Sequence, residues 1–294
     1  MRYAISVSIV LAVLVGCGPA TRHFSDAGDN QGGGGGDGNN GNGNGCSDSA
    51  KLVYVVDQNN TFSQFDPMTK TFHDLGTLSC PAQFLATPFS MSVDRNTIAW
   101  VLYSSGELFR VDIQGSLACT KTTWSSAMGL TQFGMGFSTD TAGGTTDTLF
   151  VAGGAGPSNP TSTLAKLSTT SMTAQTVGTV QGWPELTGTG SAQLWGFFPS
   201  NNGSTPRIEQ IDKTNGGATT TYMESTLNGM PTAWAFAFWG GDFFVFLMKD
   251  AETSTTVYQV NGMNGAIKGM TATNTRTIVG AGVSTCAPVV IARL

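Results

Sequence analysis

The sequence has little charge and almost no histidine. Asp, Glu, Lys and Arg make up 11% of the 294 residues, and His23 and His73 are the two histidines. His73 stands beside Asp74 with no further partner pattern, so we expect it to be a solvated surface residue. The sequence also lacks a glycine-rich phosphate-binding loop, the Gly-x-Ser-x-Gly turn of serine hydrolases and the closely spaced ligands of a zinc site. These absences argue against the commonest catalytic classes.

Positive charge is scarcer than negative charge. The chain has 14 Lys and Arg against 19 Asp and Glu, a formal net charge of −5 at pH 7, and its basic residues form no cluster. Nucleic-acid binding requires a basic face, and anionic lipid headgroups require the same. We therefore expect neither as a partner.

The residues that are abundant favour β-structure. Gly contributes 39 residues, and Thr, Ser and Asn are also plentiful. Small and β-branched residues favour strands and turns, whereas helices carry more Glu, Lys, Ala and Leu. We expect a nearly all-β protein, and the chain is long enough for one large β domain.

Residues 1–16 have the features of an export signal. A basic second residue precedes an apolar stretch over residues 4–15, which is too short for a bilayer span of about 20 residues. Residues 14–17, Leu-Val-Gly-Cys, resemble the lipobox of bacterial lipoproteins, which implies that Cys17 is acylated and becomes the mature N-terminus. Gly18, in place of Asp, implies the outer membrane as the destination. A plain signal peptide with an incidental cysteine is the alternative.

A low-complexity segment follows the lipobox. Residues 27–45 read AGDNQGGGGGDGNNGNGNG, which offers nothing to bury, so we expect residues 17–50 to be a disordered tether. A Gly-rich coil of this length has an r.m.s. reach of roughly 30 Å. Asp37 among its Asn neighbours could bind calcium, but the strict nonapeptide period of such sites is absent. The domain is expected to float close to a membrane.

From residue 51 onward the chain repeats a short pattern. Five segments share two apolar positions three residues apart and a final polar residue: FSQFD (62–66), LFRVD (108–112), LAKLS (164–168), IEQID (208–212) and VYQVN (257–261). Each follows a short apolar segment, in order LVYVV (52–56), IAWVL (98–102), TLFVA (148–152), LWGFF (194–198) and FFVFL (243–247). Each precedes a turn rich in Asp, Asn and Gly and then another strand.

A fourth strand precedes the apolar one in four of the copies. These segments are SMSVD (90–94), GMGFS (134–138), TGTGS (187–191) and AFAFW (235–239), in which small residues alternate with others. Four antiparallel strands that recur about every 50 residues form the blades of a β-propeller. We predict five four-stranded blades over residues 51–294. The tail PVVIARL (288–294) is expected to supply the inner strand that the first blade lacks.

The most aromatic segment, AWAFAFWGGDFFVF (233–246), is predicted to be the inner hairpin of the fifth blade. Gly240, Gly241 and Asp242 would form its turn, and neighbouring blades would cover both faces of its strands. A segment interrupted in this way cannot span a membrane. Trp239, beside the turn, is a candidate for an exposed stacking residue.

The cysteines predict two disulfides. With Cys17 lipidated, four cysteines remain, and an even number in an exported domain allows three pairings. Cys46 lies just before the first strand and Cys286 just after the last outer strand, so ring closure would bring them together. Cys80 and Cys119, which follow or lie in the outer strands of adjacent blades, form the second expected pair. A loop of the size that Cys80 and Cys119 would close is worth roughly 3–4 kcal/mol in the chain-entropy model.

Carboxylates near the inner strands are the candidates for a site at a channel mouth. Glycoside cleavage needs two carboxylates that flank the bond. Glu185 begins an inner strand, whereas Asp94 and Asp242 occupy turns at the opposite end, so we expect no catalytic pair and no cofactor. Glu185, Asp140, Asp242 and Trp239 are the candidate residues for binding at a channel mouth. The same oxygens could bind a channel calcium ion, which the sequence does not specify.

Three segments resemble a family of uncharacterised bacterial lipoproteins with a propeller-like repeat domain. They are FGMGFSTDTAGGTTDTLFVAG (133–153), PELTGTG (184–190) and AWAFAFWGGDFF (233–244). The likeness covers most of residues 51–286 and implies export and the fold, without supplying catalytic residues. The loop 139–147 is longer than the corresponding loops of the other inner hairpins and could reach over one mouth of the channel.

These inferences combine into one expectation about function. We expect a lipid-anchored, monomeric propeller at the cell envelope that binds or organises a protein or glycan ligand without catalysis. One alternative is a carbohydrate-active hydrolase or lyase with its site at the channel mouth. Another is an envelope-assembly factor that presents strand edges to client proteins.

Overall fold

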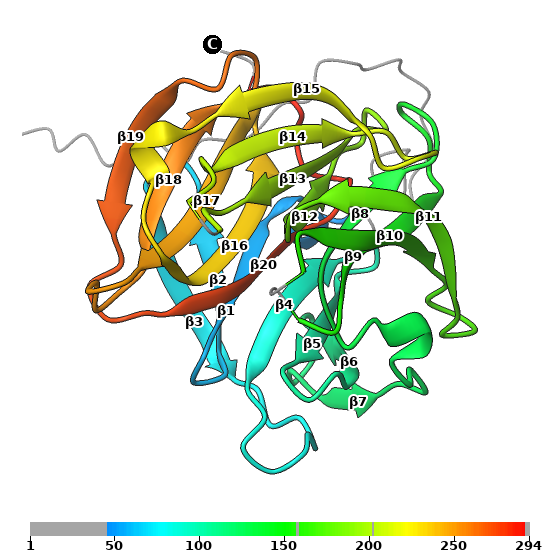
Figure 1. Cartoon of the computed structure of the whole chain (residues 1–294). Helices are drawn as coiled ribbons and strands as arrows, with labels where there is room; N and C mark the ends of the chain where they lie inside the picture. Colours follow the sequence, from blue (N-terminus) through cyan, green and yellow to red (C-terminus); the bar gives the residue numbers. More distant parts are fainter. Residues whose placement is uncertain (1–45, 157–158, 202, 292–294) are drawn as a thin grey trace, which may run out of the picture. The chain divides into compact units, whose positions relative to one another are not determined.

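The computed structural model describes residues 46–156, 159–201 and 203–291, which form five four-stranded antiparallel sheets (Figure 1). Strands are given from the channel outward. Blade 1 contains β20 (Ile278–Val283), β1 (Val53–Asp57), β2 (Thr61–Asp66) and β3 (Thr71–Thr77). Blade 2 contains β4 (Pro88–Val93), β5 (Ile98–Tyr103), β6 (Leu108–Asp112) and β7 (Cys119–Lys121). Blade 3 contains β8 (Gln132–Thr139), β9 (Asp147–Gly154), β10 (Thr161–Leu167) and β11 (Ala174–Gln181).

The remaining two blades follow the same order. Blade 4 contains β12 (Glu185–Gly188), β13 (Leu194–Phe198), β14 (Arg207–Ile211) and β15 (Ala218–Met223). Blade 5 contains β16 (Pro231–Trp239), β17 (Asp242–Lys249), β18 (Thr256–Asn261) and β19 (Ile267–Ala272). In the described residues the helical elements are three single-turn helices, η1 (Ser49–Lys51), η2 (Ala127–Gly129) and η3 (Ser225–Leu227). The chain is thus a five-bladed β-propeller, as the repeats predict.

Burial explains why each strand has its sequence pattern. Every residue of β1 and β13 is buried, because neighbouring blades cover both faces of these second strands. The outermost strand β19 instead alternates half-buried and exposed residues, which is the pattern of a strand with one face in water. Continuous apolar runs therefore mark the interior of each blade and alternating runs mark its rim.

The inner strands pack directly against one another around the channel. Each of β20, β4, β8, β12 and β16 contacts the next strand in this order, and β16 contacts β20. Glycines permit this approach: a Cβ on Gly136 would lie 2.9 Å from the backbone of Thr187, and one on Gly280 would lie 2.9 Å from the Cβ of Met91. The small residues in the predicted inner strands thus reflect close backbone packing.

The aromatic segment forms the inner hairpin of blade 5, as predicted. Trp239 pairs with Asp242, and the two residues between them, Gly240 and Gly241, have φ of +63° and +87°. Positive φ at both positions is the requirement of a tight two-residue hairpin turn, and glycine meets it without strain. The turn is therefore Gly240–Gly241, with Asp242 already in the strand.

The inner strand of blade 1 differs from the prediction. It is β20, which pairs with β1, whereas residues 288–291 form no strand. Gly280 and Gly282 let β20 pack tightly against β4, where the bulkier tail would not fit. The tail instead crosses the hairpin of blade 5, where Gly240 N–H donates a hydrogen bond of 2.7 Å to the Pro288 carbonyl.

Both predicted disulfides are present. Cys46 is bonded to Cys286 and Cys80 to Cys119, with Cα–Cα distances of 5.7 and 4.9 Å. Cys286 follows the innermost strand of blade 1 and not an outer strand, because β20 takes the place expected for the tail. Disulfides are typical of proteins exported to an oxidising compartment.

Residues 46–50, which the sequence assigns to the tether, pack against the propeller. Cys46 is held by its disulfide, Ala50 is fully buried, and the Ser284 hydroxyl donates a hydrogen bond of 2.6 Å to the Ala50 carbonyl. Residues 46–50 are thus part of the propeller and not of a tether. The expected signal peptide (1–16), Cys17 and the rest of the tether lie outside the described residues.

Apolar side chains fill the spaces between blades. Phe65 of blade 1 contacts Phe244 and Phe246 of blade 5 edge to face, with centroid distances of 5.5 and 5.2 Å. The ring centroids of Trp195 in blade 4 and Phe243 in blade 5 are 4.9 Å apart. Over the part of the chain that the structure describes, no helix has the length and apolarity needed to cross a membrane.

Candidate functional site

The two ends of the channel are built from different connections. We call the end where the inner strands begin the leading mouth; it is bordered by residues 78–87, 122–131, 182–184, 224–230 and 273–277. We call the other end the closing mouth, because Cys46–Cys286 joins the chain ends there; it is bordered by residues 94–97, 140–146, 189–193, 240–241 and 284–291.

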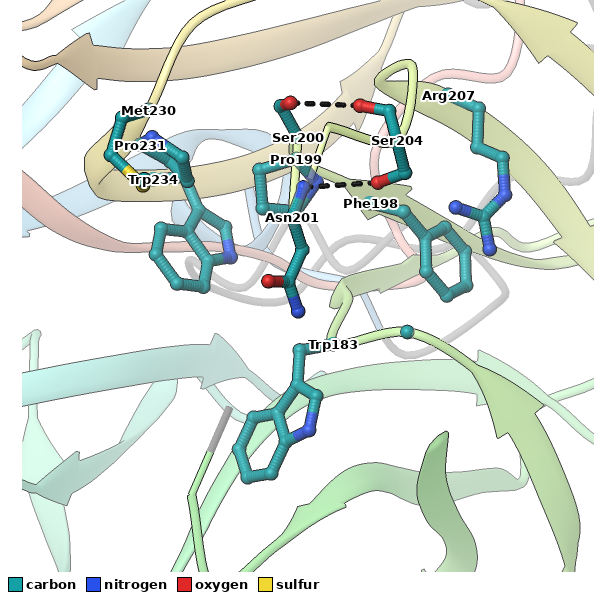
Figure 2. Close-up of a pocket in the computed structure, with 11 residues that line it drawn as sticks. Trp183, Phe198, Pro199, Ser200, Asn201, Ser204, Arg207, Met230, Pro231 and Trp234 are labelled. Carbon is teal, nitrogen blue, oxygen red and sulfur yellow. Dashed lines mark hydrogen bonds between the residues drawn. The ribbon is translucent and has the colours of Figure 1, made fainter. Parts of the chain in front are cut away.

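A cavity of about 250 Å³ opens at the leading mouth between blades 4 and 5 (Figure 2). Its lining residues are Gly182, Trp183, Phe198, Pro199, Ser200, Asn201, Ser204, Arg207, Met230, Pro231 and Trp234. Two tryptophans, a phenylalanine and a methionine supply apolar surface, and an arginine, an asparagine and two serines supply polar groups. Such a combination of apolar walls and few polar groups is typical of a ligand site.

Blade 4 supplies one wall, in which Arg207 lies on the ring of Phe198. The guanidinium carbon is 4.3 Å from the ring centroid, a cation–π contact. Arg207 Nε also pairs with Glu209 Oε1 at 2.6 Å, and Nη2 donates to the Gln181 carbonyl at 2.5 Å. Three contacts therefore hold the guanidinium in one orientation, and Glu209 compensates its charge.

Blade 5 supplies the opposite wall, and Figure 2 shows Trp234 and Met230 facing Phe198 and Arg207 across the cavity. Met230 is 66% exposed and Trp234 is half-buried. Trp183 lies below them and is only 5% exposed, and its indole N–H has no acceptor among the described residues. A buried donor left unpaired costs roughly 1–3 kcal/mol, so Trp183 calls for an acceptor.

The connection between β13 and β14 covers the cavity. The Ser200 hydroxyl donates to the Ser204 carbonyl at 2.7 Å, and the Asn201 N–H donates to the Ser204 hydroxyl at 3.0 Å (Figure 2). These bonds draw the two ends of the loop together. The Asn201 side chain consequently lies between the two tryptophans.

Glu185, the first candidate from the sequence, lies inside the ring of strands at the start of β12. It is 3% exposed, and its Oε2 accepts a hydrogen bond of 2.8 Å from the Ser90 hydroxyl of β4. Burial raises the pKa of the Glu185 carboxyl well above its ordinary value, and the Ser90 bond opposes this only in part. Burial thus favours the neutral form of Glu185, which lies two residues beyond Trp183.

The aspartates lie at the closing mouth, apart from Glu185. Asp242 pairs with Lys268 at 2.7 Å and accepts a hydrogen bond from the Gln259 amide. Asp140 accepts a bond of 2.6 Å from the Thr148 hydroxyl. The structure thus places Glu185 at the opposite end of the inner strands from the two aspartates, each of which has a partner of its own.

Trp239 is not exposed. It is 9% exposed, and its indole N–H donates a hydrogen bond of 2.9 Å to the Lys51 carbonyl of blade 1. The side chain packs between blades 5 and 1, so the prediction of an exposed stacking residue there is wrong. Trp234 of the same strand reaches the surface instead.

The long loop of blade 3 reaches over the closing mouth, as the sequence suggests. The Gly143 N–H donates to the Gly190 carbonyl of blade 4 at 2.8 Å, and Arg95 Nη2 of blade 2 donates to the Gly144 carbonyl at 2.8 Å. Arg95 also pairs with Asp147 at 3.0 Å, close to the sulfur of Cys46. These contacts fasten the end of the ring that contains the disulfide.

Metal ligands do not gather in the part of the chain that the structure describes, where no group of three or more His, Cys, Asp and Glu could hold an ion. A channel calcium site at the expected oxygens therefore has no support in the geometry. Carboxylates at opposite ends of a channel cannot share an ion.

Sequence reasoning missed the cavity at the leading mouth. Two signals could have found it: the Trp183–Pro184 pair directly before an inner strand, and the loop 199–206, rich in Ser, Asn and Pro, after the apolar strand of blade 4. The segment 233–246 is almost entirely apolar, so its sequence predicts a buried position for Trp234 as well. The distinction between buried and exposed aromatics depends on which blade edge covers them.

The fold and the cavity define a propeller with one aromatic pocket at its leading mouth. No family model matches the chain, and no curated protein matches it. Among solved structures it is similar to a chain of a nidogen/laminin complex, with 12% identity and a TM-score of 0.47 over 79% of this chain and 97% of that one. It is also similar to a protein of unknown function from Bacteroides caccae (15% identity, TM-score 0.39, 76% and 73% covered) and to a protein from Lactobacillus plantarum (13%, 0.45, 80% and 72%).

Proposed function

We propose that this protein is an exported, lipid-anchored propeller that binds a ligand at the leading mouth without catalysis. The cavity between blades 4 and 5 carries this proposal. It combines aromatic walls with an arginine that three contacts hold in place, which is the preorganisation that favours binding.

The carboxylates favour binding over glycoside hydrolysis. Hydrolysis requires two carboxylates on either side of one bond. Glu185 is enclosed beside Ser90, and Asp140 and Asp242 lie at the other mouth with partners of their own. A cavity bordered by the half-buried Trp234 and the exposed Met230, without a paired acid, favours binding.

The resemblance of residues 14–17 to a lipobox supports attachment through Cys17, and Gly18 supports the outer membrane as the location. The two disulfides support export. The resemblance of residues 133–153, 184–190 and 233–244 to a family of propeller lipoproteins also supports export.

Two experiments test the proposal. Cells fed an alkyne-tagged fatty acid should label the wild-type chain and not Cys17→Ser, and lipoprotein from the outer-membrane fraction should carry the label; an unlabelled wild type would refute the anchor. Purified full-length protein should retain a component of fractionated envelope glycans or peptides, and Trp234→Ala should lose it.

Met263→Ala is the matched control, because Met263 is 88% exposed and lies in a turn of blade 5 away from the cavity. Glu185→Gln tests for turnover of any retained component. Turnover that this variant abolished would replace the binding module with an enzyme.

A further inference from the structure

The cavity at the leading mouth presents no net charge to a ligand. Arg207 is the only ionisable residue among those that line it, and Glu209 already pairs with the guanidinium at 2.6 Å. Both side chains are mostly buried, at 16% and 13% exposed, so water screens this pair weakly. Arg207 therefore acts as a fixed hydrogen-bond donor, and the site suits an uncharged ligand better than an acid.

The side-chain hydroxyl, amide and guanidinium groups that line the cavity all lie on one side of it. Trp234, Met230 and Pro231 form an apolar wall on blade 5, while Ser200, Asn201 and Arg207 supply hydrogen-bonding groups on the side of blade 4 (Figure 2). A ligand that satisfies both sides has a flat apolar face and a polar edge. A pyranose ring has this form, because its C–H groups gather on one face and its hydroxyls point outward around the edge.

The volume limits how much of a ligand enters. Pockets for whole small molecules usually measure about 300–1,000 Å³. The cavity, at about 250 Å³, falls below that range. It holds one ring of a larger ligand, whose remainder lies over the mouth.

From these three features we infer that the cavity binds one neutral pyranose residue of a glycan, with the sugar ring against Trp234. The inference rests on the proposed function, because it names the ligand class of the same site. Arg207 and the amide of Asn201 would bind hydroxyls at the edge of the ring. The carboxylate of a uronic acid would gain no affinity from Arg207, because Glu209 already neutralises the guanidinium charge.

Fluorine NMR of the full-length protein labelled with fluorotryptophan tests the inference. The six tryptophans give separate reporters, of which Trp183 and Trp234 line the cavity. The probes are the methyl glycosides of glucose, galactose, mannose and N-acetylglucosamine, with methyl glucuronide as the acidic comparison. We expect at least one neutral glycoside to shift the signals of Trp183 and Trp234 at millimolar concentration and to leave Trp100 and Trp195 unchanged.

Variants at Trp234 separate stacking from folding. Trp234→Tyr keeps an aromatic face and should bind within about threefold of the wild type, whereas Trp234→Ala should bind at least about tenfold more weakly. Unchanged signals from the buried tryptophans would show that each variant is folded. Met263→Ala, distant from the cavity, should bind as the wild type does.

The remaining outcomes distinguish this inference from the proposed function. If the acidic glycoside alone bound, or if N-acetyl-phenylalaninamide shifted the same two signals and the neutral glycosides did not, the pyranose assignment would be wrong and the binding site would stand. If no probe shifted either signal at tens of millimolar, both would be overturned.

Discussion

The Ser90 hydroxyl donates a hydrogen bond of 2.8 Å to the carboxyl of Glu185, and this bond joins β4 of blade 2 to β12 of blade 4. These two inner strands are not neighbours, because β8 lies between them in the ring. A direct bond between them shows that the channel is narrow at this level. The central channel is therefore a packed core here, and the ligand site lies beside it at the mouth.

Replacement of Glu185 by Gln should stabilise the protein at neutral and alkaline pH. Burial raises the pKa of this carboxyl, so the folded state favours the neutral acid and the ionised form is costly. We therefore expect Glu185→Gln to unfold at a higher urea concentration than the wild type at about pH 8. Urea denaturation of both proteins measures this difference.

The pH dependence supplies the control for this prediction. A carboxyl with a raised pKa contributes its stability below the ordinary glutamate pKa, and the contribution falls as pH rises through the folded-state pKa. The wild type should thus lose stability relative to Glu185→Gln on going from acid to alkaline pH. Parallel stability curves for the two proteins would contradict the prediction.

Glu224 should produce a second loss of stability as pH rises through about 7. It is 4% exposed, its Oε1 has no partner among the described residues, and burial raises its pKa to about 7. Its contribution is complete below its ordinary value of 4.5 and disappears as pH rises through about 7. The change is at most about 3 kcal/mol, and Glu224→Gln should remove it.

A double variant distinguishes the two acids. If Glu185 and Glu224 titrate independently, the effects of Glu185→Gln and Glu224→Gln should add within about 0.5 kcal/mol. Free energies of unfolding measured between about pH 4 and 9 in the four proteins test this. A flat wild-type curve across that interval would show that neither carboxyl is buried as the structure has it.

The blades could be predicted from the sequence because each strand carries its own burial pattern. The continuous apolar run of β13 and the alternation of β19 are local signals that do not depend on distant contacts. The inner strand of blade 1 could not be located in this way. Residues 278–283 read IVGAGV, whose two glycines weaken the strand signal, and their role depends on the approach of β4.

The candidate site was predicted less well, for a related reason. Trp234 and Trp239 belong to one strand and look alike in sequence. Blade 1 covers Trp239, whose N–H bonds to Lys51, whereas Trp234 borders the cavity. Which aromatic residue is free to bind a ligand depends on long-range packing between blades, which no local pattern records.

Removal of the disulfide that closes the ring should cost more stability than removal of the other one. Cys46 and Cys286 are separated by 240 residues, and Cys80 and Cys119 by 39. The chain-entropy model assigns the longer loop the larger effect, about 5–6 kcal/mol against about 4 kcal/mol. Chemical denaturation of the paired Cys→Ser double variants under non-reducing conditions measures both.

Loss of the Cys46–Cys286 disulfide should also allow local unfolding at the chain ends, which loss of Cys80–Cys119 should not. Without it, β20 is joined to β1 only by strand pairing, so the chain ends should become sensitive to protease before the rest of the domain unfolds. The variant of Cys80 and Cys119 keeps the ring closed and should not show this cleavage. Equal protease sensitivity in the two variants would argue against ring closure by Cys46 and Cys286.

The contact between blades 3 and 4 predicts opposite effects for two glycines in outer strands. A Cβ on Gly178 of β11 would collide with the carbonyl oxygen of Asn215, in the turn that follows β14. A backbone atom cannot move aside as a flexible side chain can, so Gly178→Ala should destabilise the protein by about 1–3 kcal/mol.

Gly269 of β19 is the matched control, because a Cβ there would meet nothing within 4 Å. Alanine at that position reduces the entropy of the unfolded chain and should leave stability unchanged or raise it by up to about 1 kcal/mol. Urea denaturation of the two variants gives the comparison. If they behaved alike, the turn of blade 4 would not lie against β11, and the packing between blades 3 and 4, on which the order of the ring depends, would have to be revised.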